Sequence, residues 1–441
     1  MDEKYEIRFK KNSLNKIFKN LFSDEKKEQF CIILAKREQV NKLVILKEIE
    51  ICYPKQSEIL SSSLTHISIK KDFIYKILLD LDKRVDVDTL VEIHTHPFLE
   101  SNSKVSFSSI DDEDEKNFKE YLKENYPKTS YASLVFSNNS YKGRIYLDEK
   151  IEEIEIKEWN ITKEIQDPKY LDIYNRNIDY MGIDNLKKIF STEKISIVGV
   201  GGLGSVVAEH LINMGFNNLV LIDNDIVEYS NLNRLVGAKY KDAEDKRLKV
   251  EVLKEHLLSI NPFLNIKAIN SDIKSDEALN EVLESNKVFL TTDNHSSRAF
   301  VNDFCLRYFI PFISIGVNIS VKNGIVSDIS GEVIKIFPGE KFCLRCLGRV
   351  KQINIDYENI KSEEIKEKIL KRGYITQHKD PAVKTLNTIL ASLAVDSYIN
   401  EFTNYNRESS ILVYENNKIP TIYEDNMSIK NRKKDCFICN L

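Results

Sequence analysis

Apolar and polar positions alternate along the chain in ways that predict a series of strands and helices. Residues 28–35 (EQFCIILA), 43–51 (LVILKEIEI) and 89–96 (TLVEIHTH) are short and rich in β-branched residues, which is typical of strands. Residues 195–200 (ISIVGV) form a mostly apolar run of the kind that parallel sheets bury on both faces. Residues 299–309 instead have the apolar spacing of an amphipathic helix. The whole pattern predicts an α/β protein.

A domain boundary is expected where this pattern gives way to polar residues. Residues 151–156 alternate as a strand does, and residues 158–169 (EWNITKEIQDPK) follow without such a pattern. We therefore expect one domain at residues 1–160 and a second at residues 161–441. The length of 441 residues is enough for each domain to bury its own core.

Composition excludes several classes of partner. The formal net charge is −4 and the charged residues are well mixed, so we expect no binding of nucleic acid. The first residues (MDEKYEIRFKKN) contain no apolar signal region, and no apolar run reaches the roughly 18 residues that a membrane span needs, so we expect neither secretion nor a membrane anchor. Seven cysteines are too few for a disulfide scaffold, which indicates a cytoplasmic protein.

A glycine-rich turn follows the strand at residues 195–200 and predicts a nucleotide site. It has the pattern G-x-G-x-x-G, in which glycine lets the backbone turn tightly and approach a polyphosphate at the N-terminus of a helix. Asp223 ends the next strand and is suited to bind ribose hydroxyls. Taken alone, these features fit a nicotinamide-dependent dehydrogenase as well. The glycines are Gly199, Gly201, Gly202 and Gly204.

The residues that follow favour a different family. Residues 224–234 (NDIVEYSNLNR) have no counterpart expected in a dehydrogenase and resemble the ThiF/MoeB and ubiquitin-activating enzyme superfamily. The resemblance continues through the rest of this domain. It implies a Rossmann-like adenylation fold, ATP and Mg²⁺ as cofactors, a ubiquitin-like protein or peptide as substrate, and a homodimer.

The same resemblance assigns roles to individual residues. It implies that Asp223 and Asp225 belong to the nucleotide site, that Asp293 holds Mg²⁺, and that Arg176 reaches the phosphates of the other subunit. It further implies phosphate contacts by three residues, Asn231, Arg234 and Lys249. The plain alternative is that Arg234 and Lys249 are solvated surface charges. Their joint position behind the glycine turn favours the site.

Two C-x-x-C pairs predict a structural zinc site. Such spacing lets each pair hold one edge of a tetrahedral zinc ion, and four thiolates leave no position for a substrate. The ThiF-like enzymes carry the same paired arrangement. A redox role for either pair is the alternative. The four residues are Cys343, Cys346, Cys436 and Cys439.

A second metal site is predicted in the first domain. His94 and His96 project from one face of a strand, and Asp111 near the start of a helix could add an oxygen ligand. Three such ligands leave the fourth zinc position for water, whose pKa falls to about 7. With Glu28 and Ser108, these residues resemble the JAMM (MPN-plus) metalloprotease motif.

That resemblance implies an α+β domain that cleaves peptide or isopeptide bonds after ubiquitin-like proteins. His94, His96 and Asp111 would be zinc ligands, Glu28 the general base and Ser108 the group that stabilises the oxyanion. Two alternatives remain. Ser109 and Asp112 have the same S-x-x-D spacing, and the three ligands could be ordinary strand histidines and a helix cap. The gap of 11 residues between His96 and Ser108 is about four longer than the family usually has.

No cysteine occurs at residues 347–383, where enzymes that activate ubiquitin usually carry their catalytic cysteine. The expected product is therefore an acyl-adenylate without a thioester. Our main hypothesis is a bifunctional protein that trims a ubiquitin-like tail and adenylates its carboxylate, as in bacterial conjugation or defence systems. One alternative is a microcin-type adenylyltransferase that leaves AMP on a peptide. The other is an adaptor that binds a ubiquitin-like fold without cutting it.

Overall fold

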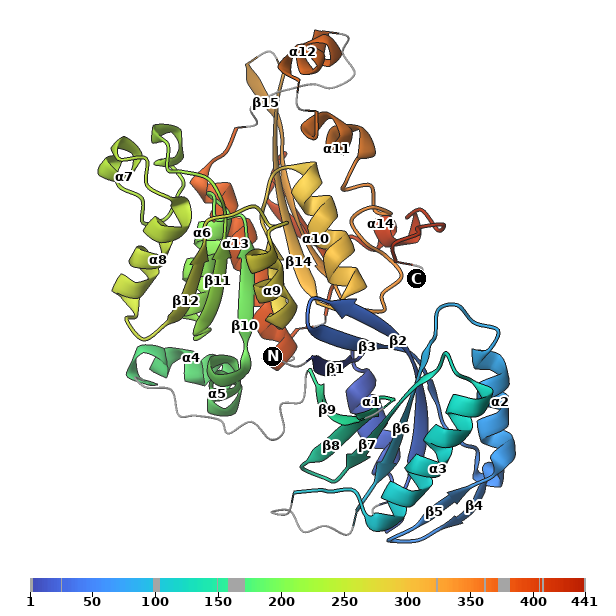
Figure 1. Cartoon of the computed structure of the whole chain (residues 1–441). Helices are drawn as coiled ribbons and strands as arrows, with labels where there is room; N and C mark the ends of the chain where they lie inside the picture. Colours follow the sequence, from blue (N-terminus) through green and yellow to red (C-terminus); the bar gives the residue numbers. More distant parts are fainter. Residues whose placement is uncertain are drawn as a thin grey trace. The chain divides into compact units, whose positions relative to one another are not determined.

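The computed structural model divides the chain into two compact units, residues 1–164 and 165–441 (Figure 1). It describes residues 3–24, 26–97, 104–148, 150–157, 171–322, 324–360, 362–371, 381–403, 405–406 and 408–439. The boundary expected at residues 158–169 lies outside the described residues. Among the described helices, none combines the length and the apolar character needed to cross a membrane.

The first unit is built on a closed barrel in the order β1-β3-β2-β6-β7-β8-β9. Parallel pairing of β1 with β9 closes it, and β2 pairs antiparallel with both β3 and β6. The strands are β1 (Lys4–Arg8), β2 (Phe30–Val40), β3 (Leu43–Cys52), β6 (Thr89–Thr95), β7 (Ser130–Phe136), β8 (Tyr141–Tyr146) and β9 (Ile151–Ile156). The strands predicted at residues 28–35, 43–51, 89–96 and 151–156 are thus confirmed. Three keep their ends to within one residue, whereas β2 begins at Phe30 and continues to Val40.

Alternating side chains of β2 serve two apolar cores. Cys31 and Ile33 belong to a cluster that also contains Ile17 and Leu21 of α1 (Ser13–Leu21). Ile32 belongs to a second cluster with α2 (Lys71–Leu81) and α3 (Ser109–Asn125). The period of two in the sequence is therefore used to bury both faces of the strand. A 3₁₀ turn, η1 (Gln56–Glu58), leads to a separate hairpin of β4 (Ile59–Ser62) and β5 (Ile67–Ile69).

The second unit is organised by a mixed sheet in the order β12-β11-β10-β13-β14-β15-β16-β17. Pairing is parallel from β12 to β14 and antiparallel from β14 to β17. The strands are β10 (Lys194–Val198), β11 (Asn218–Ile222), β12 (Asn265–Ile269), β13 (Lys287–Leu290), β14 (Phe312–Lys322), β15 (Ile325–Ile336), β16 (Ile411–Glu415) and β17 (Thr421–Glu424). Strand order reverses between β10 and β13, and ligands bind at the carboxyl ends of strands around such a point.

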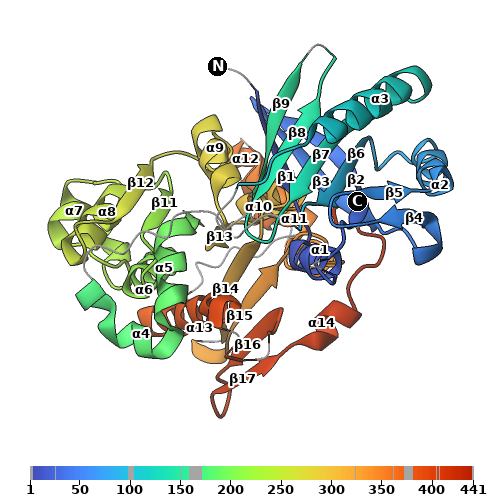
Figure 2. The same cartoon turned by 90° about the horizontal axis from the view of Figure 1, so that it is seen from below.

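Helices cover both faces of this sheet (Figures 1 and 2). The main apolar cluster joins one face to α4 (Asn175–Met181), α5 (Ile183–Thr192), α6 (Gly204–Asn213), α8 (Lys249–Ile260) and α13 (Lys384–Thr403). The other face carries α9 (Asp276–Glu284) and α10 (His295–Arg307), the latter being the amphipathic helix predicted at residues 299–309. The remaining elements are η2 (Leu171–Tyr174), η3 (Tyr229–Asn231), α7 (Tyr240–Glu244), α11 (Gln352–Glu358), α12 (Glu363–Lys371) and α14 (Asn426–Lys430).

Candidate functional site

The glycine turn joins β10 to α6 in a form that side chains would prevent. Gly199 has a φ of 88°, and a Cβ on Gly204 would lie 1.9 Å from the carbonyl oxygen of Gly199. A Cβ on Gly201 would meet no atom of the described residues within 4 Å. Two glycines are therefore needed for the turn, while Gly201 leaves an open face at the N-terminus of α6. An open backbone face at a helix N-terminus suits the approach of a polyphosphate.

Asp223 lies at the centre of the turns that follow β10 and β11. Its Oδ2 accepts the backbone N–H of Val200 at 2.8 Å, and its Oδ1 accepts that of Asp225 at 2.9 Å. Burial raises the pKa of Asp223, although Lys249 and the two N–H donors oppose this shift. The predicted ribose ligand is thus held rigidly beside the glycine turn.

Three of the expected phosphate and nucleotide contacts gather around this point. Lys249 Nζ lies 2.7 Å from Asp225 Oδ2, and the Lys249 side chain is only 11% exposed. Arg234 packs against Gly202: a Cβ added to Gly202 would lie 2.7 Å from Cγ of Arg234. The guanidinium of Arg234 donates to the carbonyl of Ser230. Both cations are therefore held by local contacts near the glycine turn, and their role at the phosphates stays a prediction.

The other expected nucleotide residues differ in their surroundings. Asn231 is buried and its Oδ1 accepts the backbone N–H of Glu228 at 3.1 Å, so it caps the η3 turn. Asp293 is exposed and follows Thr292, which borders Gly199. Arg176 is exposed on α4, and its role in a second subunit stays a prediction.

The four expected cysteine ligands converge in the second unit. Their Sγ atoms all lie within 4.8 Å of one another. Cys343 Sγ is 3.6 Å from Cys436 Sγ, and Cys346 Sγ is 3.8 Å from Cys439 Sγ. A tetrahedral zinc with Zn–S bonds of about 2.3 Å has edges of about 3.8 Å, whereas a disulfide bond is about 2.05 Å long. The cluster therefore fits a structural zinc ion and does not consist of disulfides.

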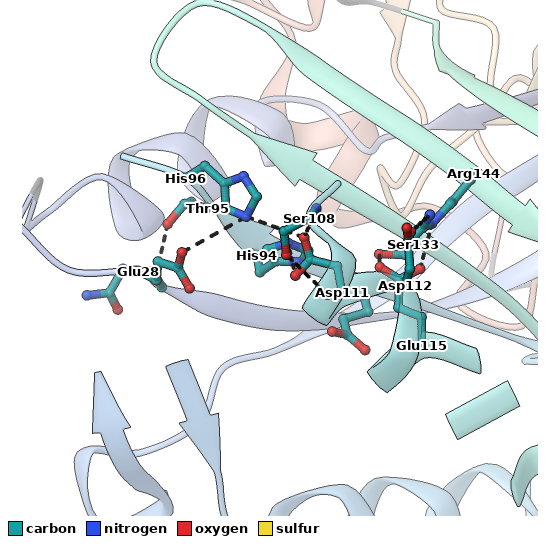
Figure 3. A network of polar contacts seen from close by, with 12 residues as sticks. Glu28, His94, Thr95, His96, Ser108, Asp111, Asp112, Glu115, Ser133 and Arg144 are labelled. Atoms are coloured by element: carbon teal, nitrogen blue, oxygen red, sulfur yellow. Dashed lines mark hydrogen bonds and ion pairs between the residues drawn. The ribbon is translucent and has the colours of Figure 1, made fainter. Parts of the chain in front are cut away.

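The three expected zinc ligands of the first unit also converge (Figure 3). His94 Nε2 is 3.3 Å from Asp111 Oδ1, and His96 Nε2 is 3.5 Å from Asp111 Oδ2. His94 Nε2 is buried and makes no hydrogen bond of normal geometry to the described residues. A buried nitrogen in this condition is costly, and a metal ion would satisfy it. The donor set of two imidazoles and a carboxylate fits zinc with one open position.

Strand register brings Glu28 to the same place. Phe30 pairs with His94, so the antiparallel register sets Glu28 opposite His96. Glu28 Oε1 lies 4.0 Å from His96 Nε2. The Thr95 hydroxyl accepts the backbone N–H of Gln29 at 2.9 Å and fixes the end of β2. Burial raises the pKa of Glu28 to about 7, against an opposing effect of His94. A carboxyl with this pKa is suited to exchange protons near neutral pH.

Helix α3 decides between the two S-x-x-D registers. Ser108 is its N-cap: the Ser108 hydroxyl accepts the N–H of Asp111 at 3.2 Å, and Asp111 Oδ2 accepts the N–H of Ser108 at 2.6 Å. Asp112 instead lies 2.6 Å from Nη1 of Arg144. The geometry therefore groups Ser108 and Asp111 with the histidines. Asp111 caps the helix, which was the alternative to a metal ligand. Its carboxylate is also close enough to both imidazoles for the three side chains to share one metal ion.

Sequence reasoning missed a buried network behind this cluster (Figure 3). Glu115, one turn after Asp111 on α3, is 2% exposed. It accepts hydrogen bonds from Ser133, Arg144 and Tyr146, each at 2.8 Å. The guanidinium of Arg144 also lies 3.7 Å from the centre of the Phe107 ring. The partners of Glu115 lie on β7 and β8, so no local signal in the sequence could have identified this network.

The comparison with protein families gives a match in the second unit. A model of the ThiF family matches residues 174–438. Ubiquitin-like modifier-activating enzyme 5 of Dictyostelium discoideum is 29% identical over 259 residues, which are 56% of this chain and 62% of that protein. Molybdopterin-synthase adenylyltransferase of Escherichia coli strain K12 is 33% identical over 178 residues, which are 40% of this chain and 68% of that protein.

Other matches differ in how much of each protein they cover. SUMO-activating enzyme subunit 2 of Dictyostelium discoideum is 32% identical over 174 residues, which are 39% of this chain and 24% of that protein. The chain thus spans less than two thirds of the length of these modifier-activating enzymes. A solved structure of the microcin C7 biosynthetic enzyme MccB in complex with N-formylated MccA has a TM-score of 0.49 and 18% identity, and covers 93% of this chain and 99% of that one.

Proposed function

The chain belongs to the ThiF family, and from this membership we propose that its second unit is an adenylyltransferase that activates a C-terminal carboxylate with Mg-ATP. The substrate would be a ubiquitin-like protein or a peptide. The observation that carries the proposal is the glycine turn between β10 and α6, which combines an open position at Gly201 with Arg234 packed against Gly202.

ATP would supply the electrophilic α-phosphorus and Mg²⁺ would offset charge on the departing pyrophosphate. Asp223 is positioned for the ribose, and Arg234 and Lys249 are suited to hold phosphate oxygens. Lys249 contacts Asp225 in this structure, so bound phosphates would compete with the Asp225 carboxylate for Nζ of Lys249. Asp293, exposed at the carboxyl end of β13, is the proposed Mg²⁺ ligand.

The product we propose is an acyl-adenylate, with no thioester on this chain. Cys31 and Cys305 are 0% exposed, and four further cysteines form the thiolate cluster. Cys52, in the first unit, is the remaining thiol of the seven. A nucleophilic thiol must be accessible and activated, and burial raises the pKa of Cys52 to about 11. The acyl group would therefore pass to a partner or another nucleophile.

We further propose a homodimer in which Arg176 of one subunit contacts phosphates bound to the other. The support is the exposure of Arg176 on α4 and the family resemblance. In a mixed dimer, a subunit with Arg176→Ala should lower the activity of the wild-type nucleotide site beside it. Equal activity in mixed and wild-type dimers would contradict this role.

For the first unit we propose a zinc metallopeptidase that acts after ubiquitin-like proteins. The carrying observation is the group of His94, His96 and Asp111 within 4.8 Å, with Glu28 opposite His96. Zinc held there would lower the pKa of a bound water to about 7. Glu28 would take a proton from that water, and the Ser108 hydroxyl would donate to the oxyanion that forms at the scissile carbonyl.

The two proposed activities use the same carboxylate. Removal of tail residues exposes a new C-terminus, and an activating site on the same chain receives it at high effective concentration. The thiolate cluster suits a reducing cytoplasm. By analogy of the two motif sets, the protein would serve a bacterial ubiquitin-like conjugation or defence pathway.

Product mass tests the main proposal against its two rivals. Incubation with Mg-ATP and a ubiquitin-like protein or peptide encoded beside this chain should yield pyrophosphate and a transient adenylate that hydrolyses. A product that keeps AMP would instead support the microcin-type alternative. The absence of an accessible thiol for a thioester among the described residues fits that alternative and the main proposal equally well. An uncut, tail-extended substrate that binds a chain containing one zinc ion would support the adaptor alternative.

A further inference from the structure

Arg298 on α10 is a buried cation to which none of these roles has been assigned. It is 9% exposed. Its Nη2 donates to the Ser314 hydroxyl at 2.9 Å, and its Nη1 faces the carbonyl oxygens of Ile315 at 3.3 Å and Thr292 at 3.5 Å. Its Nε is buried and has no hydrogen-bond partner among the described residues. Throughout the described part of the chain, no carboxylate forms an ion pair with it. A buried guanidinium without an anion is costly.

The acidic groups near Arg298 form no ion pair with it among the described residues. Glu332 faces Gly316 on the neighbouring strand, but its Oε2 already accepts Arg349 Nε at 2.8 Å. Asp293 is exposed to solvent. Burial lowers the pKa of Arg298, and Arg349 adds to this effect, while Glu332 and Asp293 oppose it. Arg298 therefore has two carboxylates in its electrostatic surroundings, but neither is paired with it directly.

Strand register places this charge at the edge of the nucleotide site. Val198 pairs with Leu290, and Leu290 pairs with Ser314. Arg298 thus contacts β14 at the carboxyl end of the parallel strands, where β10 enters the glycine turn. Thr292 connects the two places, because its carbonyl faces Arg298 while a Cβ on Gly199 would lie 3.0 Å from its backbone nitrogen.

Gly316 leaves space in front of the guanidinium. A Cβ at this position would lie 3.8 Å from both Nη1 and Nη2 of Arg298 and 3.7 Å from Cγ of Glu332. These are ordinary contact distances, so an alanine would fit without strain. Gly316 is also partly exposed. The absence of a side chain therefore leaves room for a ligand atom in contact with a buried cation that none of the described carboxylates pairs with.

We propose that Arg298 and Gly316 form the seat for the terminal carboxyl group of the acyl substrate. This inference rests on the adenylation proposed for the second unit. One carboxylate oxygen would bond to the α-phosphorus of ATP as the bond to the bridging oxygen of pyrophosphate breaks. The other oxygen would stay beside Arg298. The main chain that leads to this carboxyl group would pass over Gly316, which favours a substrate with small terminal residues.

An anion at this point could also be a phosphate of the nucleotide, and two probes separate the sources. AMP reports the nucleotide site alone. The stable acyl-adenylate mimic 5′-O-(N-glycylsulfamoyl)adenosine adds an acyl group. Wild-type protein should bind the mimic more tightly than AMP in calorimetry. Gly316→Val should weaken binding of the mimic by about tenfold or more, which is about 1.4 kcal/mol, and should change AMP affinity by less than about twofold.

Further variants make the result independent of folding. Gly316→Ala should give a smaller loss in the same direction, and Arg298→Lys should weaken the mimic with little effect on AMP. Ser320→Val, further along β14, should change neither. Equal losses for AMP and the mimic would assign Arg298 to the nucleotide and overturn the inference. Unchanged binding of both by Gly316→Val would also overturn it. If wild-type protein bound neither probe, the proposed adenylation would fail and this inference with it.

Discussion

Glu28, just before β2, lies opposite His96, just after β6, with Oε1 of the glutamate 4.0 Å from Nε2 of the histidine. The register of β2 and β6 produces this contact, and Thr95 secures it by accepting the N–H of Gln29. A general base must lie within reach of the water it activates. The proposed peptidase therefore depends on the pairing of two strands that are distant in sequence.

Replacement of His94 tests the metal site of the first unit. We expect two zinc ions per wild-type chain and one in His94→Ala, because two remaining ligands hold zinc poorly. Asp112→Asn is the matched control: Asp112 contacts Arg144 and not the histidines, so this variant should keep two ions. Native mass spectrometry after removal of free metal gives the count. One ion in the wild type would contradict the site.

Loss of one thiolate tests the second metal site. Cys436→Ser should remove one zinc ion and lower the free energy of unfolding of the second unit by on the order of 5 kcal/mol, because structural zinc contributes its binding energy to folding. Cys305→Ser, at a buried thiol outside the cluster, should keep the zinc. Zinc content and thermal unfolding of both variants provide the measurement. Normal stability with zinc absent would refute a structural role.

Two glycines of the same turn should respond differently to alanine. Gly204→Ala places a Cβ 1.9 Å from the carbonyl of Gly199 and should destabilise the unit by about 2 kcal/mol or more. The new Cβ of Gly201→Ala meets no atom within 4 Å in the described part of the chain, so this variant should fold normally and lose affinity for ATP. Urea unfolding and ATP titration separate the two effects. Normal ATP binding by Gly201→Ala would show that the phosphates do not approach this face.

Arg144 should contribute more to stability than a surface arginine with similar partners. Arg144→Met leaves the buried carboxylate of Glu115 without its cation and should cost about 3 kcal/mol. Arg84→Met removes ion pairs with Asp80, Asp86 and Glu50, whose side chains are 46 to 59% exposed, and should cost about 0.5 kcal/mol or less. The unfolding transition of the first unit measures both. Equal costs would show that Glu115 does not depend on Arg144.

Features set by local sequence were the ones predicted well. The glycine turn, the paired cysteines and the strand carrying His94 and His96 each follow from residues that are close in sequence. Sequence alone left the choice between Asp111 and Asp112 open, because both have the required spacing. The helix resolves it, since adjacent residues on a helix point about 100° apart. Asp111 turns to the histidines and Asp112 to Arg144.

Features that depend on distant pairing were not predicted. The parallel contact between β1 and β9, which closes the barrel, joins residues near both ends of the first unit. The surroundings of Arg298 depend on the register of β10, β13 and β14, which brings Thr292 and Ser314 to its guanidinium. Neither periodicity nor motif spacing contains that register.

Pyrophosphate release tests the central claim, carboxylate activation by the second unit, most directly. Wild-type protein with Mg-ATP and a ubiquitin-like protein or peptide encoded beside it should release pyrophosphate, and amidation of the substrate's C-terminus should abolish the release. Asp293→Ala should abolish it too, whereas Asp276→Ala, at an exposed acid on α9, should not. Release that is equal in Asp293→Ala, or no release with any candidate, would contradict the account.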